Sequence, residues 1–152
     1  MLEAWAPRLH ATRIVVADDD AAASHLAKAA MTLALPPELP GAVVPVSQVD
    51  FAALAGSRET VLLLFRDVEG VVRAQGAGLT PALAPHVNLG NVHYAPGRRS
   101  VTPSVFLSGD EVAQVEALAA AGFDVDARAV PDDPPAGPGE LRHRYDAARG
   151  TG

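Results

Sequence analysis

The sequence contains no cysteine, which excludes disulfide bonds and metal sites built from thiolates. Aromatic residues make up only 5% of the chain while hydrophobic residues make up 49%, so the core has to be built from Ala, Val and Leu. No apolar run approaches the roughly 20 residues of a membrane span, and a soluble cytoplasmic protein is expected. Lys28 is the only lysine, and the net charge is −6. This charge argues against a nucleic-acid partner, which needs clustered basic residues.

Strand-like and helix-like segments alternate along the 152 residues. Short apolar or β-branched runs predict strands at residues 13–17, 42–46, 60–65, 86–89, 105–107 and 123–130. Capped or periodic segments predict helices at residues 2–9, 21–35, 47–55, 67–74 and 108–121. This order indicates an α/β fold with an open, mostly parallel sheet and helices on both faces. The run at residues 60–65 is wholly apolar, as expected of a strand covered on both sides.

The composition changes near the C-terminus. We expect one α/β domain over residues 1–130 and a Pro- and Gly-rich, largely disordered tail over residues 131–152, within which residues 140–149 can form a short helix. The tail has few apolar groups to offset an ordering entropy of roughly 1–2 kcal/mol per residue. Deletion of the residues after Asp133 is therefore expected to leave the melting temperature nearly unchanged.

In open parallel sheets, ligands bind beyond the carboxyl ends of the strands. Asp18, Asp19 and Asp20 follow the first predicted strand. Such carboxylates can hold a magnesium ion or cap the following helix, and the capping interpretation is favoured. Arg66 follows the most apolar strand, where its forked donors can bind an anion; a solvated surface arginine is an equal alternative.

Two further turns contain glycine and polar residues. The segment Asn88-Leu89-Gly90-Asn91 is the most specific local signal, because glycine permits close backbone approach and successive N–H groups can form an anion nest. The basic turn at residues 97–99 is either a loop for an acidic partner or a plain surface turn. The five histidines show neither metal-ligand spacing nor a nucleophile-like context. The residues alone therefore predict an α/β domain with an anion site at its strand ends, and no catalytic constellation.

Taken in order, several segments resemble a known family. They are R-I-V-V-A-D-D-D at residues 13–20, A-A-M-T-L-A-L-P-P at 29–37, V-L-L-L-F-R-D at 61–67 and N-L-G-N-V-H-Y-A-P-G-R-R at 88–99. The family is enzyme IIB of the mannose/fructose/sorbose class of the bacterial phosphoenolpyruvate-dependent sugar phosphotransferase system. The resemblance covers residues 2–130, and the order and spacing of the segments carry it.

The resemblance implies a chemistry and a set of partners. Family members take a phosphoryl group from a phosphohistidine of the IIA domain onto their own histidine, and pass it to a sugar moved by the membrane proteins IIC and IID. Neutral imidazole is a good nucleophile and phosphoimidazole a labile donor, so no cofactor is implied. The resemblance also implies a cytoplasmic protein that associates peripherally with the membrane transporter. It leaves open whether the protein forms a homodimer.

The sequence departs from the family pattern at its beginning. The family carries its phosphorylated histidine in a loop reading roughly R-I-D-D-R-L-I-H-G-Q-V, and Met1 falls on the final V. The acceptor histidine and the family's first central strand are therefore expected upstream, with Met1 an internal GTG valine codon read as a start. No catalytic residue is carried over. By resemblance, five residues line the phosphohistidine pocket: Asp19, Arg66, Asn88, Gly90 and Asn91. The family has a second glycine where Asn91 stands.

Two other interpretations compete with the phosphoryl carrier. A degenerate IIB-like protein would act as a non-catalytic binding or regulatory module. A phospho-receiver domain would explain the acidic turn after residues 13–17, but it needs a late strand ending in lysine. Because Lys28 is the only lysine, the receiver interpretation is disfavoured.

Overall fold

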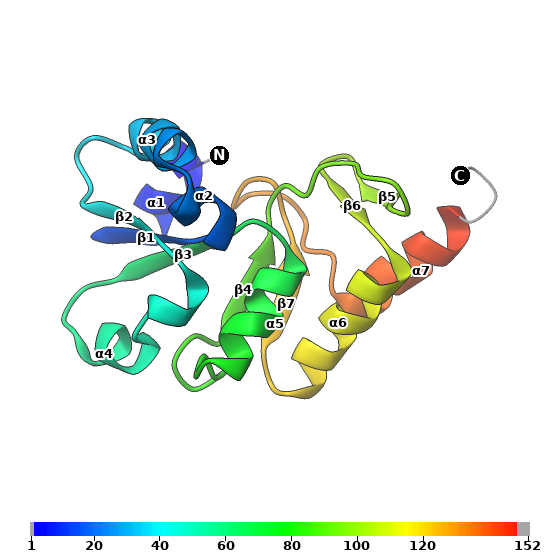
Figure 1. Cartoon of the computed structure of the whole chain (residues 1–152). Helices are drawn as coiled ribbons and strands as arrows, with labels where there is room; N and C mark the ends of the chain where they lie inside the picture. The colour runs from blue at the N-terminus through cyan, green and yellow to red at the C-terminus, as the bar shows by residue number, and fades with distance from the viewer. Residues whose placement is uncertain (1, 149–152) are drawn as a thin grey trace. The chain divides into compact units, whose positions relative to one another are not determined.

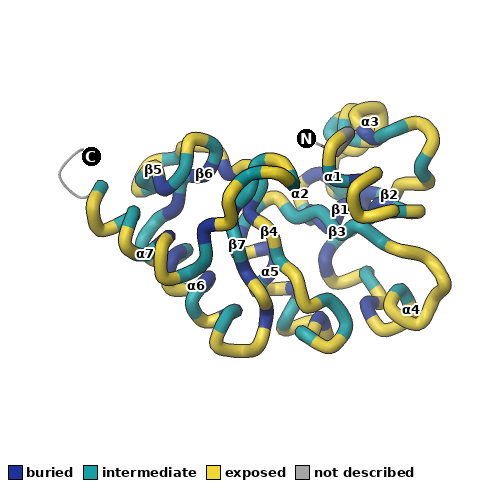
Figure 2. The backbone as a smooth tube through the Cα atoms, turned by 180° about the vertical axis from the view of Figure 1, so that it is seen from behind, coloured by how far each residue is buried: buried dark blue, intermediate teal, exposed yellow. Residues whose placement is uncertain are grey.

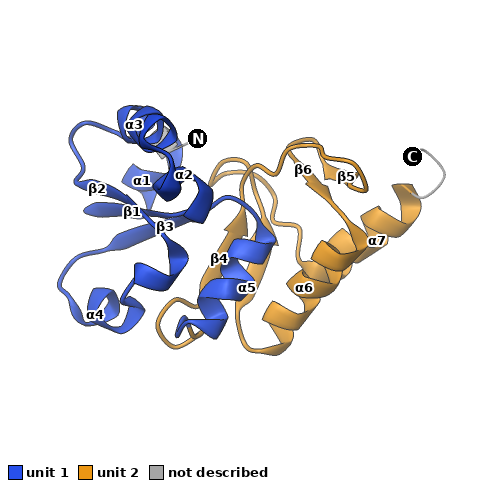
Figure 3. Cartoon of the chain, viewed as in Figure 1, with its two compact units in different colours: residues 1–79 blue, residues 80–152 orange. Residues whose placement is uncertain are grey.

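The computed structural model describes residues 2–148. The chain consists of two compact units, residues 1–79 and residues 80–152 (Figure 3). The division falls inside the segment that the sequence analysis treats as one domain. None of the helices within residues 2–148 combines the length and the apolar character needed to cross a membrane.

Unit 1 is built on a three-stranded parallel sheet with the order β2-β1-β3 (Figure 1). Its strands are β1 (Arg13–Ala17), β2 (Gly41–Val44) and β3 (Val61–Phe65). Its helices are α1 (Leu2–Arg8), α2 (Asp19–Ala23), α3 (His25–Ala34), the 3-10 helix η1 (Val46–Gln48), α4 (Phe51–Gly56) and α5 (Val68–Gly76). The parallel sheet between helices confirms the α/β class. In this sheet β1 has hydrogen-bonded partner strands on both sides.

One buried cluster of unit 1 lies on the face of this sheet under α2 and α3. Ile14, Val16 and Val43 are buried together with Ala21 and Leu35. Figure 2 shows β1 mostly in dark blue and the outer face of α3 in yellow. The wholly apolar strand β3 is only half-buried at all five positions, contrary to the expectation of a strand covered on both faces. It has one partner strand among the described residues, so its outer edge lacks the cover that a second neighbour provides.

The structure differs from the predicted secondary structure where a side chain interrupts a helix. The expected helix over residues 21–35 is two helices, because Ser24 has extended backbone angles and its hydroxyl accepts from the Ala27 N–H at 3.2 Å. That interaction caps α3 and makes Ser24 the end of α2. Asp67 caps α5 by accepting from the Gly70 N–H at 2.9 Å, as the sequence predicted.

Unit 2 contains two short, two-stranded sheets. The strands β4 (His86–Leu89) and β7 (Asp124–Ala127) pair in parallel, and β5 (Arg99–Thr102) pairs antiparallel with β6 (Val105–Leu107). Helix α6 (Gly109–Ala120) begins with the full capping box that the sequence predicted. Asn88 and Leu89 lie at the carboxyl end of β4, also as expected.

The C-terminal segment is more ordered than expected, and the short helix expected within residues 140–149 is present as α7 (Pro138–Ala147). Leu141 on this helix is completely buried. Ala136 is buried and bridges to Ala127 at the end of β7. The Arg99 guanidinium lies 4.4 Å from the centre of the Tyr145 ring. Composition predicted disorder because the segment is polar overall, whereas a few well-placed apolar and aromatic groups order it on unit 2.

Candidate functional site

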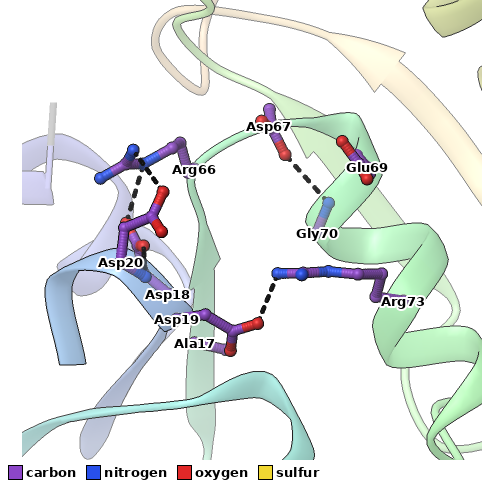
Figure 4. A pocket seen from close by; sticks show the side chains of 9 residues that line it. All are labelled: Ala17, Asp18, Asp19, Asp20, Arg66, Asp67, Glu69, Gly70 and Arg73. Atoms are coloured by element: carbon purple, nitrogen blue, oxygen red, sulfur yellow. Dashed lines mark hydrogen bonds and ion pairs between the residues drawn. The ribbon is translucent and has the colours of Figure 1, made fainter. Parts of the chain in front are cut away.

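The site in unit 1 starts from the register of its sheet. Ala17 at the end of β1 lies opposite Phe65 at the end of β3. The residues that follow these two strands therefore meet at the same carboxyl edge, although 48 positions separate Asp18 from Arg66. Figure 4 shows their side chains pointing toward one another across this edge.

Asp18 is the buried anchor of this edge, with 6% of its surface exposed. One carboxylate oxygen accepts hydrogen bonds from the Asp20 and Ala21 N–H groups, both at 3.1 Å, and so caps α2. The other oxygen accepts from Arg66 Nε at 3.1 Å. The capping interpretation of the acidic turn is thus confirmed. Within residues 2–148, no group of three or more His, Cys, Asp or Glu side chains is placed to hold a metal ion.

Arg66 is held by two carboxylates. Besides its bond to Asp18, its Nη1 donates to Asp20 Oδ2 at 3.1 Å. The Arg66 side chain is 54% exposed and that of Asp20 is 81% exposed. Arg66 is therefore neither a freely solvated arginine nor a buried one: two fixed contacts orient its guanidinium while one side faces solvent.

Asp19 connects three elements of unit 1. Its Oδ1 accepts from the Val46 N–H at 2.8 Å, just beyond β2, and its Oδ2 pairs with Arg73 of α5 at 2.7 Å. These contacts surround a pocket with a volume of about 150 Å³. Its charged lining residues are Asp18, Asp19, Asp20, Arg66, Asp67, Glu69 and Arg73. The structure thus brings together the two predicted site residues of unit 1, Asp19 and Arg66.

Arg73 is the pocket residue that sequence reasoning missed. It lies one helical turn beyond Glu69 and Gly70 on α5, so it shares their helix face. Asp67 caps this helix directly after Arg66, which turns the same face toward the strand ends. The spacing from Gly70 to Arg73 was the available signal, but the partner of Arg73 depends on the sheet.

The remaining three predicted residues, Asn88, Gly90 and Asn91, belong to unit 2. The Asn88 side chain donates to the Arg128 carbonyl and accepts from the Arg128 N–H, each at 3.0 Å. This pair of bonds continues the β4–β7 ladder beyond its last backbone pair, so Asn88 organises main chain. Gly90 and Asn91 follow β4 at its carboxyl end.

The basic turn at residues 97–99 serves the packing of unit 2. Arg98 donates to both oxygens of Glu111, at 2.8 and 3.0 Å, and to the His93 carbonyl at 2.9 Å. Burial alone would raise the pKa of Glu111, but hydrogen bonds from Arg98 and from the Ser108 N–H outweigh it and hold this pKa below its usual value. Arg98 thus ties the loop after β4 to the start of α6.

We expect Glu111→Gln to lower the melting temperature by about 4–8 °C at pH 7, because a charge-assisted hydrogen bond contributes about 2 kcal/mol. A lowered pKa means that this stabilisation is complete above the unfolded value of 4.5 and is lost as pH falls through the lower folded value. Thermal melts of both proteins from pH 7 to pH 3 should therefore converge at the acid end. A constant difference across this range would contradict the assignment.

His86 lies at the amino end of β4, whereas Asn88 and Gly90 lie at or just beyond its carboxyl end. Its Nδ1 is 3.2 Å from Asp124 Oδ2, at the amino ends of β4 and β7. Both side chains are largely exposed. No histidine lines the unit 1 pocket within the described residues.

The parallel α/β architecture is that of IIB domains of sugar permeases. It matches the IIBSor domain of the sorbose permease from Klebsiella pneumoniae with a TM-score of 0.80, over 93% of this chain and 86% of that one, at 23% identity. It matches manxB from Thermoanaerobacter tengcongensis with a TM-score of 0.81, over 95% and 87%, at 28% identity. The chain belongs to the family of PTS system sorbose subfamily IIB components, whose model matches residues 2–142. The family expected from the sequence is confirmed.

Curated relatives agree with this membership. The mannose-specific EIIAB component of the PTS system of Escherichia coli strain K12 is 28% identical over 134 residues, which cover 86% of this chain and 40% of the relative. The fructose-specific EIIB component of Bacillus subtilis strain 168 is 27% identical over 135 residues, covering 88% and 81%. The chain therefore spans less than half of the E. coli protein that it matches.

Proposed function

We propose that this chain is the phosphoryl-carrying IIB component of a mannose/sorbose-type sugar phosphotransferase system. It would receive phosphate from a IIA phosphohistidine and deliver it to a sugar transported by IIC and IID. It would act in the cytoplasm, associated peripherally with these membrane components, through an acceptor histidine supplied upstream of Met1. Family membership and the names of the mannose and fructose relatives support this proposal.

The observation that carries the chemistry is the orientation of Arg66 by Asp18 and Asp20 at the carboxyl edge of β3. In each transfer, one P–N bond to a histidine breaks as the next bond to phosphorus forms, and negative charge spreads over the phosphoryl oxygens. The protein has to supply positioning and charge compensation. A guanidinium with a fixed direction and solvent-facing donors provides both. The assignment of Asn88, Gly90 and Asn91 to this pocket stays a prediction from the resemblance.

We expect the chain of residues 1–152 to take no acid-labile phosphate. The assay supplies enzyme I, the histidine carrier protein, IIA and phosphoenolpyruvate, and measures label on the chain. A version extended by the upstream coding sequence should become labelled stoichiometrically, because it restores the nucleophile. Labelling of His93, or of any other histidine in residues 1–152, would contradict the proposal.

A second candidate function is a degenerate IIB that binds partners without carrying phosphate. The unit 1 pocket has no histidine among its described lining residues, which is expected under both candidates. The DNA upstream of Met1 separates the two candidates. In-frame codons for His-Gly-Gln support the carrier, whereas a stop codon or a different sequence supports the binding module.

A further inference from the structure

We propose that Arg73 is a second phosphate-binding arginine, and that it acts with Arg66 as the two arms of one anion site in unit 1. The proposal rests on the proposed function for its physiological ligand, a phosphoryl group carried on a histidine nitrogen. The test of the site itself does not depend on that function.

The two arginines enter the same pocket from different elements. Arg66 follows β3, and Arg73 comes from the second turn of α5 (Figure 4). Their side chains are 54% and 51% exposed, so neither is sealed from a ligand. Guanidinium groups that approach from two directions can bind different oxygens of one tetrahedral phosphoryl group.

Carboxylates orient both guanidinium groups without saturating them. Arg66 makes two bonds, to Asp18 and Asp20, and Arg73 makes one ion pair, to Asp19, among the described residues. A guanidinium has about five N–H donors, so most donors of each arginine are left for a ligand. Asp19 is itself fixed by the Val46 N–H and is therefore a positioning residue for Arg73.

The charge of the pocket limits how tightly it binds an anion. Five carboxylates and two guanidinium groups line it, so the pocket as a whole is negative. This field weakens the binding of any phosphate. Binding therefore depends on direct hydrogen bonds from the two guanidinium groups.

The experiment is a titration of the chain with inorganic phosphate and with phosphoramidate, followed through the side-chain Nε–H NMR signals of Arg66 and Arg73. We expect both signals to move with one binding curve for each anion. Arg73→Gln should weaken binding at least about fivefold, as should Arg66→Gln. Arg58→Gln removes the same charge from an exposed position of unit 1 outside the pocket and should leave the affinity nearly unchanged.

A second variant tests the positioning role. Asp19→Asn should abolish the ligand-dependent shift of Arg73 while that of Arg66 persists, and thermal melts identify any unfolded protein. Equal weakening in all three arginine variants would mean that only net charge matters, and would overturn the proposal. So would a stationary Arg73 signal in the unmodified chain. A failed phosphotransfer assay with intact phosphate binding would overturn the proposed function alone.

Discussion

Deletion of residues 134–152 is expected to lower the melting temperature by more than roughly 10 °C. The deleted segment contains α7, whose Leu141 is completely buried, together with the buried Ala136. The deletion also removes Arg142, which pairs with Glu116, and Tyr145, whose ring lies under the Arg99 guanidinium. Burial of a leucine side chain contributes about 1.5–3 kcal/mol before any cavity is counted. For a chain of this size, each kcal/mol corresponds to about 2–4 °C.

A single substitution separates packing from chain length. Leu141→Ala should destabilise the protein by about 3 kcal/mol, since it removes a buried side chain and leaves a cavity. Leu33→Ala is the matched control, because Leu33 lies on α3 with 87% of its surface exposed. Thermal or urea melts should show a clear loss for the first variant and almost none for the second. Equal melting temperatures for the deletion and the full chain would restore the original expectation of a disordered tail.

Replacement of Asp18 is expected to have the second largest effect. Asp18→Ala removes the cap of α2 and leaves Arg66 Nε without its buried partner. Loss of a cap costs about 1 kcal/mol, and the broken, partly buried ion pair adds to it, for a total of about 2–4 kcal/mol. Urea melts measure this loss directly.

Two variants divide this effect into its parts. Asp18→Asn keeps a side chain that caps helices well. The decrease in its free energy of unfolding therefore measures the ion pair with Arg66. Asp20→Asn makes the same change of charge at a side chain that is 81% exposed, and should cost less than about 1 kcal/mol. If Asp18→Asn proved as mild as Asp20→Asn, the buried pair would contribute nothing to stability.

Local features of the fold were predictable because they depend on residues a few positions apart. The strand β1 and the capping box at Ser108 and Glu111 occur where the sequence predicted them. The first rests on a run of β-branched apolar residues, and the second on hydrogen bonds between residues three positions apart. The break at Ser24 was missed because a continuous alanine-rich helix satisfies the same local preferences.

The site was predictable only in part. The rule that ligands bind beyond strand ends pointed to Asp19 and Arg66, which do share a pocket. It could not show that Arg73 pairs with Asp19 in this lining, because that contact depends on how α5 packs beside the sheet. It also could not show that Asn88 bonds the Arg128 main chain, since that contact spans 40 residues.

The amino-acid sequence by itself determined the α/β class, the capped helix starts and the membership in the IIB family. These follow from short-range patterns and from the order and spacing of segments along the chain. Tertiary structure alone decided that Asp18 holds Arg66, that Asp19 holds Arg73, and that the polar C-terminal segment packs as α7. The physical reason is that strand order and register place residues tens of positions apart within hydrogen-bonding distance, and no short stretch of sequence encodes that placement.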